Sequence, residues 1–375
     1  MKVSSNFDSG NIEVIEATSP DNIRLNIKVD AGGEFFQWFH FRIAGVKGEE
    51  LVIFIENAND ASYTKGWEGY RACVSYDRET WFRTETDYDG EELTIRHMAE
   101  ADTIYFAYFA PYSMERHRDL IAQTQLHPFC RHQVLGETVD GDDMDLLIIG
   151  DEIDAPIKLW AIARQHPGEA MAEWWMEGFI DRLLDEADPV SRALLSQACF
   201  YIVPNMNPDG SKRGHLRTNA AGANLNREWQ KPSMERSPEV FLVDAKMKEV
   251  GLDFCIDVHG DEGLPYNFIA GADAIPNITD KLIQLRVDFE NALERANPDF
   301  QQIHGYPKGA PGKANMTMGS AHIASTHNAL AMTLEMPFKD NDNAPDYFQG
   351  WSPARSGKLG ASCLDALYAI LPDLK

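Results

Sequence analysis

A strand-length apolar run, Ile157–Ala163, is followed by a short polar segment and then at once by a helical pattern. Residues 166–169 read His-Pro-Gly-Glu, and proline followed by glycine favours a tight turn. From Glu169 to Leu184 the pattern is that of a helix. We therefore expect His166 and Glu169 at the carboxyl end of a strand, which is where open α/β sheets bind ligands.

A second apolar run of strand length, Phe254–Val258, leads directly to His259. If two strands end at the same edge of one sheet, His166, Glu169 and His259 meet there. Two imidazoles and a carboxylate are a typical ligand set of a catalytic zinc, which keeps a fourth position for water or substrate. A His-x-x-Glu pair alone is more often solvated surface or the first turn of a helix, so this prediction of one zinc depends on the placement at strand ends.

Composition limits the classes of partner. The 375 residues carry a formal net charge of −25, which argues against nucleic acid or an anionic membrane as the main partner and is otherwise typical of a soluble protein. No charged-then-apolar leader stands in the first thirty residues and no run of eighteen apolar residues occurs, so we expect a cytoplasmic protein. The five cysteines are far apart and mostly in apolar stretches, which favours buried free thiols.

Residues 1–115 have the pattern of an all-β domain. Short alternating segments recur between Gly, Asn and Asp turns, and this spacing predicts a β-sandwich. The aromatic run Phe35–Phe41 lies in a predicted strand, Phe35–Ile43, and is best explained as sandwich core, with His40 as a packed histidine rather than a ligand. The other predicted strands begin at Ile23 or span 51–55, 70–76, 93–96 and 103–109.

Residues 116–375 follow a different pattern. After a predicted helix and connector over 114–135, continuous apolar runs of strand length alternate with helical stretches. Such runs indicate strands buried on both faces, so we predict an α/β domain whose mixed, mainly parallel sheet is flanked by helices. The predicted strands span 146–149, 159–163, 198–203, 254–258 and 330–334, and the predicted helices span 169–184, 238–250, 280–296 and 353–371.

A polar segment between the two halves of the predicted metal site is rich in arginine and asparagine. A strand runs into the turn Asn207-Pro208-Asp209-Gly210, and Arg213, Arg217 and Asn224-Leu225-Asn226-Arg227 follow. Arginine is the side chain best suited to hold a carboxylate at two points or to stabilise an oxyanion. By itself, however, a loop with three arginines is usually solvated surface.

Six short motifs stand in a fixed order along the chain: His166-Pro167-Gly168-Glu169, Asn207-Pro208-Asp209-Gly210, Arg217, Leu225-Asn226-Arg227, Asp257-Val258-His259 and Thr333-Leu334-Glu335. This order resembles that of the zinc metallocarboxypeptidase family. The cytosolic carboxypeptidase branch is the most similar, because it also has an N-terminal β-sandwich with segments similar to residues 36–41 and 109–112. The resemblance therefore covers nearly the whole chain.

The resemblance implies a role for each matching residue. His166, Glu169 and His259 match the zinc ligands, and Glu335 matches the general base that deprotonates the attacking water and passes the proton to the leaving amine. Arg217 matches the residue that polarises the scissile carbonyl and holds its oxyanion.

Further residues match the substrate-binding part of the family pattern. Asn226 and Arg227 match the pair that binds the terminal carboxylate, which makes such an enzyme an exopeptidase.

Two positions depart from the pattern. Asn224 stands where the family usually has an aspartate that orients the first zinc histidine, so the basicity of that ligand is expected to be lower. The mobile active-site tyrosine has only Tyr306 as a candidate, and a loop-packing role is an equally good explanation for it.

The resemblance implies a zinc-dependent carboxypeptidase that releases single residues from the C-termini of peptides or protein tails. Relatives in the cytosolic branch include deglutamylases, so an acidic substrate is one alternative. The stretch Lys308–His322, with Lys313, is a candidate lining of the specificity pocket, although lysines in such a loop are usually solvated.

Two other hypotheses stay open: a non-catalytic peptide-binding protein, and an amidase or esterase on the same scaffold. Side-chain preference, oligomeric state and the role of the β-sandwich are not predicted.

Overall fold

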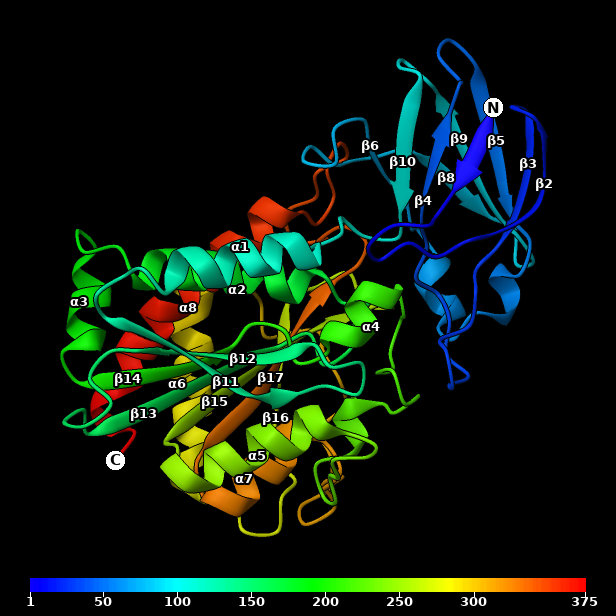
Figure 1. The fold of residues 1–375 in the computed structure, drawn as a ribbon. Coiled ribbons are helices and arrows are strands. Elements are labelled where there is room, and N and C mark those ends of the chain that lie inside the picture. Colours follow the sequence, from blue (N-terminus) through cyan, green and yellow to red (C-terminus); the bar gives the residue numbers. More distant parts are fainter.

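The computed structural model describes residues 1–375 and has a β-sandwich placed against one end of an α/β unit (Figure 1). Two five-stranded sheets form the sandwich, which confirms the predicted fold of this part. Their orders are β1-β4-β10-β6-β7 and β2-β3-β5-β9-β8. The strands are β1 (Lys2–Ser4), β2 (Glu13–Ser19), β3 (Asn22–Asn26), β4 (His40–Ala44), β5 (Glu50–Ile55), β6 (Cys73–Ser75), β7 (Phe82–Arg83), β8 (Glu85–Tyr88), β9 (Leu93–Met98) and β10 (Thr103–Ala107).

The aromatic run differs from its predicted strand. Strand β4 begins only at His40, and residues 35–39 form an irregular segment whose backbone bonds to a neighbouring turn, because Phe36 N donates to Ser62 Oγ and Ser62 N donates back to Phe36 O. Apart from Phe35, the aromatic side chains of the run are buried in the sandwich core, as predicted. His40 is also buried, and its Nδ1 lies 3.0 Å from Ser9 Oγ, so it is the packed histidine that the sequence indicates.

The α/β unit is built on a seven-stranded mixed sheet in the order β11-β12-β14-β13-β15-β17-β16. Its four central strands run parallel and the flanking strands pair antiparallel, as the continuous apolar runs predict. One prediction is wrong: the connector expected up to Leu135 is shorter, because residues from Cys130 onward pair with β12 as an edge strand. The strands are β11 (Cys130–Glu137), β12 (Asp143–Ile149), β13 (Ile157–Ala163), β14 (Ala198–Val203), β15 (Phe254–Asp261), β16 (Phe268–Gly271) and β17 (Leu330–Pro337).

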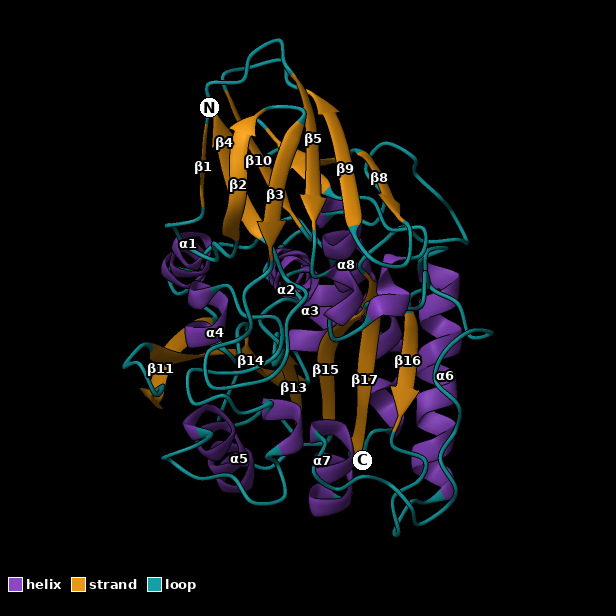
Figure 2. Ribbon diagram, turned by 90° about the vertical axis from the view of Figure 1, so that its right-hand side faces the viewer, coloured by secondary structure: helices purple, strands orange, loops and turns teal.

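Helices cover both faces of this sheet (Figures 1 and 2). Helices α2, α3, α6 and α8 pack on one face, and α5 and α7 on the other. Helices α5 and α6 have the predicted bounds. No helix of the molecule is both long enough and apolar enough to cross a lipid bilayer. The helices are α1 (Met114–Thr124), α2 (Met171–Leu183), α3 (Pro189–Leu195), α4 (Pro208–Arg213), α5 (Pro238–Val250), α6 (Asp280–Ala296), α7 (Gly319–His327) and α8 (Pro353–Ile370).

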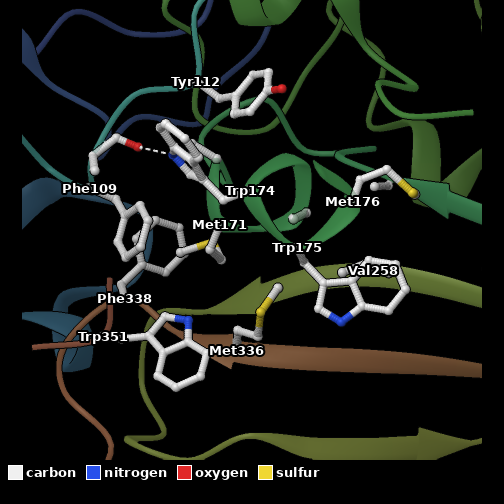
Figure 3. Close-up of a cluster of buried hydrophobic side chains, with 14 of the residues drawn as sticks. Phe109, Tyr112, Met171, Trp174, Trp175, Met176, Val258, Met336, Phe338 and Trp351 are labelled. Carbon is white, nitrogen blue, oxygen red and sulfur yellow. Dashed lines mark hydrogen bonds between the residues drawn. The ribbon is translucent and has the colours of Figure 1, made fainter. Parts of the chain in front are cut away.

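The sandwich and the α/β unit share one apolar core. Figure 3 shows Phe109 beside Phe338, and Trp174 of α2 donating a hydrogen bond from its indole Nε1 to Ala110 O at 3.0 Å. The rings of Tyr112 and Trp174 meet edge to face with centroids 4.8 Å apart. Such buried aromatic packing holds the two parts in a fixed relation.

Candidate active site

Two neighbouring parallel strands bring the three predicted metal ligands together. His166 and Glu169 stand on the turn between β13 and α2, while His259 lies near the end of β15, which pairs with β13. His166 Nδ1 is 2.7 Å from Glu169 Oε1, and His259 Nδ1 is 2.8 Å from Glu169 Oε2. Candidate ligand atoms of all three residues lie within 4.8 Å of one another, and all three side chains are buried.

The arrangement of the ring nitrogens fits a bound cation. The two Nδ1 atoms of His166 and His259 face each other at 3.2 Å. The opposite nitrogens have their own acceptors, since His166 Nε2 lies 3.0 Å from Asn224 Oδ1 and His259 Nε2 lies 2.9 Å from Asp257 Oδ1. A metal-binding histidine typically donates its second ring N–H to such an acceptor, which leaves the first nitrogen free for the metal. Burial lowers the pKa of His166 to about 4, so this ring is neutral at pH 7.

Sequence reasoning missed the support behind His259. Asp257 Oδ2 accepts a hydrogen bond from Gln165 Nε2 at 2.7 Å, and Gln165 Oε1 accepts one from Trp229 Nε1 at 2.9 Å. Asp257 and His259 are two residues apart on one strand, so their side chains are on the same face. An Asp-x-His spacing at a strand end therefore predicts that the aspartate and the histidine, here Asp257 and His259, lie side by side.

Glu335 stands next to the metal ligands because of strand register. Strands β15 and β17 run parallel, and His259 is the direct partner of Glu335 in this pairing. The Glu335 side chain is 7% exposed, and its Oε2 has no hydrogen-bond partner in the protein. Burial raises the pKa of Glu335 above its usual range, which moves it towards the operating range of a general base.

A pocket of about 710 Å³ opens over this cluster, and Arg217, Asn226 and Arg227 line it together with the three ligands and Glu335. The Arg217 guanidinium lies between two rings of the sandwich, 5.3 Å from the Tyr63 centroid and 5.7 Å from that of Phe35. No carboxylate forms an ion pair with Arg217, and the residue lines the pocket. Asn226 is held by its Oδ1, which accepts from Gly319 N at 2.8 Å.

Other sequence candidates have different surroundings. Tyr306 lines the pocket and donates a hydrogen bond from its hydroxyl to Asp261 Oδ2 at 2.6 Å. Arg213 pairs with Asp140 at 2.7 Å and does not line the pocket. From the stretch 308–322 only Met318 lines it, so Lys308 and Lys313 are not part of this wall.

Part of the pocket wall comes from segments that carried no sequence signal. The turn Ser62–Gly66 of the sandwich lines the pocket, as do Asp261 and Glu262 at the end of β15. These residues belong to no recognisable motif. The turn is far from the metal ligands in sequence, and only the docking of the two parts of the molecule brings it near.

Comparison with known families agrees with this geometry. The family model described as Zinc carboxypeptidase matches residues 119–341, and the one described as Cytosolic carboxypeptidase N-terminal domain matches residues 3–109. The chain belongs to the zinc carboxypeptidase family. This metallocarboxypeptidase therefore carries both the catalytic fold and the N-terminal β-rich domain of the cytosolic branch.

Solved structures with the same fold include two bacterial relatives of this carboxypeptidase. A crystal structure from Shewanella denitrificans is 56% identical, covers 99% of both chains and has a TM-score of 0.98. A metallo-carboxypeptidase from Pseudomonas aeruginosa, in complex with (2-guanidinoethylmercapto)succinic acid, is 44% identical, covers 100% of both chains and also has a TM-score of 0.98. Human cytosolic carboxypeptidase 1 is 26% identical over 69% of this chain, which spans only 25% of that protein's length.

Proposed function

We propose that this enzyme removes single residues from the free C-termini of peptides or protein tails, with one zinc ion held by His166, Glu169 and His259. A zinc ion bound there supplies a Lewis acid and makes water acidic enough to act as a nucleophile. Glu335 takes the proton from the attacking water and delivers it to the leaving amine. Arg217 donates to the carbonyl oxygen, where negative charge develops.

The arrangement that carries this proposal is the union of the metal ligands, Glu335 and two arginines in one pocket. A peptide-binding protein has no need of a buried carboxylate beside the metal ligands. Arg227 and Asn226 are the groups that we assign to the substrate's terminal carboxylate, since guanidinium binds carboxylates at two points. The ligand of the Pseudomonas relative is a derivative of succinic acid and so has two carboxylates, which supports a pocket that accepts free carboxylates.

Removal of glutamate is a narrower hypothesis. It rests on the similarity to the cytosolic branch alone, and the chain spans only 25% of the length of human cytosolic carboxypeptidase 1. Peptides that differ only in their last residue, with glutamate, lysine or leucine at that position, test it directly. A preference for glutamate of tenfold or more in kcat/KM supports the hypothesis, and a preference for leucine or lysine contradicts it.

The test of the carboxypeptidase proposal combines Arg227→Met with amidation of the substrate. If Arg227 binds the terminal carboxylate, either change removes the same charge-assisted contact, at a cost of roughly 1.5–3 kcal/mol, or about ten- to a hundredfold in kcat/KM. The two losses should therefore not add. Part of the loss should appear in kcat, because the carboxylate also fixes where the scissile bond lies.

Rates are measured by mass spectrometry on matched free and amidated peptides, with and without a metal chelator. If variant and wild type show the same ratio between the two substrates, the amidase hypothesis replaces the carboxypeptidase one. Binding without turnover in the zinc-loaded protein would instead favour the peptide-binding hypothesis.

A further inference from the structure

Glu262 is a buried carboxyl that the mechanism above does not use. It directly follows β15, is 6% exposed and lines the same pocket as the metal ligands. No other residue donates a hydrogen bond to its side chain, and it forms no ion pair, although the other buried carboxylates of the pocket have partners or an assigned role. Its neighbour Asp261 shows the contrast, because it accepts from the Tyr306 hydroxyl, Gly263 N and Leu264 N.

Such a carboxyl is costly. Burying an ionisable group without a donor destabilises the folded protein or shifts the group towards its neutral form. Burial raises the pKa of the Glu262 carboxyl to about 8, so it is mostly neutral at pH 7 until a cation bound beside it favours the charged form. Its oxygens are not fully enclosed by the protein, so they face the pocket, where a donor on the ligand can reach them.

The surroundings favour a cationic donor. After burial itself, the strongest charge effect on the pKa of Glu262 comes from Arg217, which lowers it, while the carboxylates Glu169 and Asp261 raise it to a smaller extent. Arg217 is engaged by the rings of Phe35 and Tyr63 and is assigned to the carbonyl oxygen. The carboxylates of Glu262, Glu169 and Asp261 would repel an anionic ligand group placed beside Glu262. They would attract an ammonium or guanidinium group at the same position.

The position of Glu262 indicates which part of the substrate it meets. It packs against the sandwich turn, since a Cβ added to Gly66 would lie 3.1 Å from Glu262 Cβ. Tyr63 of the same turn contacts Arg217, so Glu262 and Arg217 share the sandwich side of the pocket. If Arg227 holds the terminal carboxylate and Arg217 the scissile carbonyl, this side faces the residue before the scissile bond.

We propose that Glu262 forms a subsite for a positively charged nitrogen on the penultimate residue of the substrate. The nitrogen belongs either to a lysine or arginine side chain or to the free α-amino group of a dipeptide. This inference rests on the proposed carboxypeptidase function, because that function sets the direction of the peptide. Asp261 is less suited to this role, since each of its oxygens already accepts at least one hydrogen bond within the protein.

The experiment replaces Glu262 by Gln, which keeps the shape and removes the charge. The matched control is Glu68→Gln, an exposed carboxylate near the same turn that does not line the pocket. N-acetylated peptides with one fixed C-terminal residue and lysine, norleucine or glutamate before it are compared. A second pair, one dipeptide with free and acetylated amino group, separates the α-amine from the side chain.

The expected result is a loss of roughly ten- to a hundredfold in kcat/KM for whichever cationic substrate uses the subsite, with little change for norleucine. Glu68→Gln should leave the ratio between substrates unchanged. Because both rates come from one sample, their ratio does not depend on the folded fraction. Calorimetric binding of the same peptides to Glu335→Gln protein, with and without Glu262→Gln, gives a second readout without turnover.

Three negative outcomes are distinguishable. If the wild type cleaves the peptides but Glu262→Gln changes all of them equally, or changes none, the subsite is wrong and the carboxypeptidase proposal stands. If glutamate before the scissile bond is preferred and this preference disappears in Glu262→Gln, a neutral Glu262 donates to an anion and the cationic subsite is wrong. If the zinc-loaded wild type neither binds nor cleaves any peptide, both proposals fail.

Discussion

The two metal-binding histidines differ in the acceptor behind each ring. His259 has a carboxylate, Asp257, and His166 has an amide oxygen, Asn224. A charged acceptor raises the basicity of the imidazole that donates to it, whereas a neutral one does so less. The sequence predicts this difference, because Asn224 stands where the family usually has an aspartate. The contact between Asn224 Oδ1 and His166 Nε2 shows that this residue is the acceptor behind the first histidine.

Glu335→Gln tests the proton-handling role of a single carboxylate. The amide has nearly the same shape but cannot accept and return a proton, so we expect bound zinc and thermal stability to be kept. Turnover should fall by at least about a hundredfold, which is the usual scale of general acid–base catalysis. Metal analysis, a melting curve and kcat on one peptide measure all three quantities. Rates close to those of the wild type would assign the general base to another group.

The sequence predicts the site residues that lie at strand ends. It does not predict those that enter the site only because the two parts of the molecule pack together. His166, Glu169 and His259 each follow an apolar run, so period and turn chemistry place them at one sheet edge, whereas Glu335 was identified from the resemblance to the family. Glu262 is only three residues beyond His259, yet nothing in its local pattern shows that a glycine turn of the sandwich closes over it.

At the level of elements, long regular segments were predicted closely and irregular ones were not. Helices α5 and α6 and strand β14 have the expected bounds because each is bounded by its own capping or turn residues. The sequence predicts strand for the segment 35–39 because it belongs to the alternating stretch Phe35–Ile43. Side-chain hydrogen bonds to its backbone, such as the one from Phe36 N to Ser62 Oγ, compete with sheet pairing there.

The contact between α2 and α8 allows a matched test of packing. A Cβ added at Gly360 would lie 2.1 Å from Trp175 O on α2, whereas one at Gly357 would find its nearest atom at 3.5 Å. Gly360→Ala therefore forces the helices apart and should destabilise the protein by about 1–3 kcal/mol. Gly357→Ala should be neutral or stabilise it by up to about 1 kcal/mol, since alanine favours the helix.

Urea unfolding of the two variants measures this difference. Because α2 begins at Met171, two residues after Glu169, we also expect Gly360→Ala to weaken zinc binding while Gly357→Ala does not. Equal stability of the two variants would show that the helices can separate at little cost.

For the whole molecule, the β-sandwich is a wall of the catalytic pocket and a support for its arginine loop. Asp30, which follows β3, is buried and accepts hydrogen bonds from three consecutive backbone amides of the catalytic unit. Leu216 N donates to Oδ1 at 2.6 Å, and Arg217 N and Thr218 N donate to Oδ2 at 2.8 and 2.9 Å. The ring contacts of Phe35 and Tyr63 then hold the Arg217 guanidinium itself.

Asp30→Asn should therefore lower activity although residue 30 lies outside the metal cluster. An asparagine presents N–H groups to at least one of these donors, so the loop loses charge-assisted hydrogen bonds that are worth roughly 1.5–3 kcal/mol each. If the loss displaces Arg217, kcat falls by about tenfold or more, because an oxyanion donor acts mainly in the transition state. Bound zinc should be unchanged, since no metal ligand touches Asp30.

Asp8→Asn is the control for a general loosening of the sandwich. Asp8 also joins the sandwich to the following unit, through a hydrogen bond from Met114 N at 3.0 Å, but it does not line the catalytic pocket. Both variants should lower the melting temperature, while only Asp30→Asn should lower kcat measured well below either melting temperature. If the two variants lose kcat to the same extent, the sandwich stabilises the enzyme without positioning Arg217, and the loop must take its order from the catalytic unit alone.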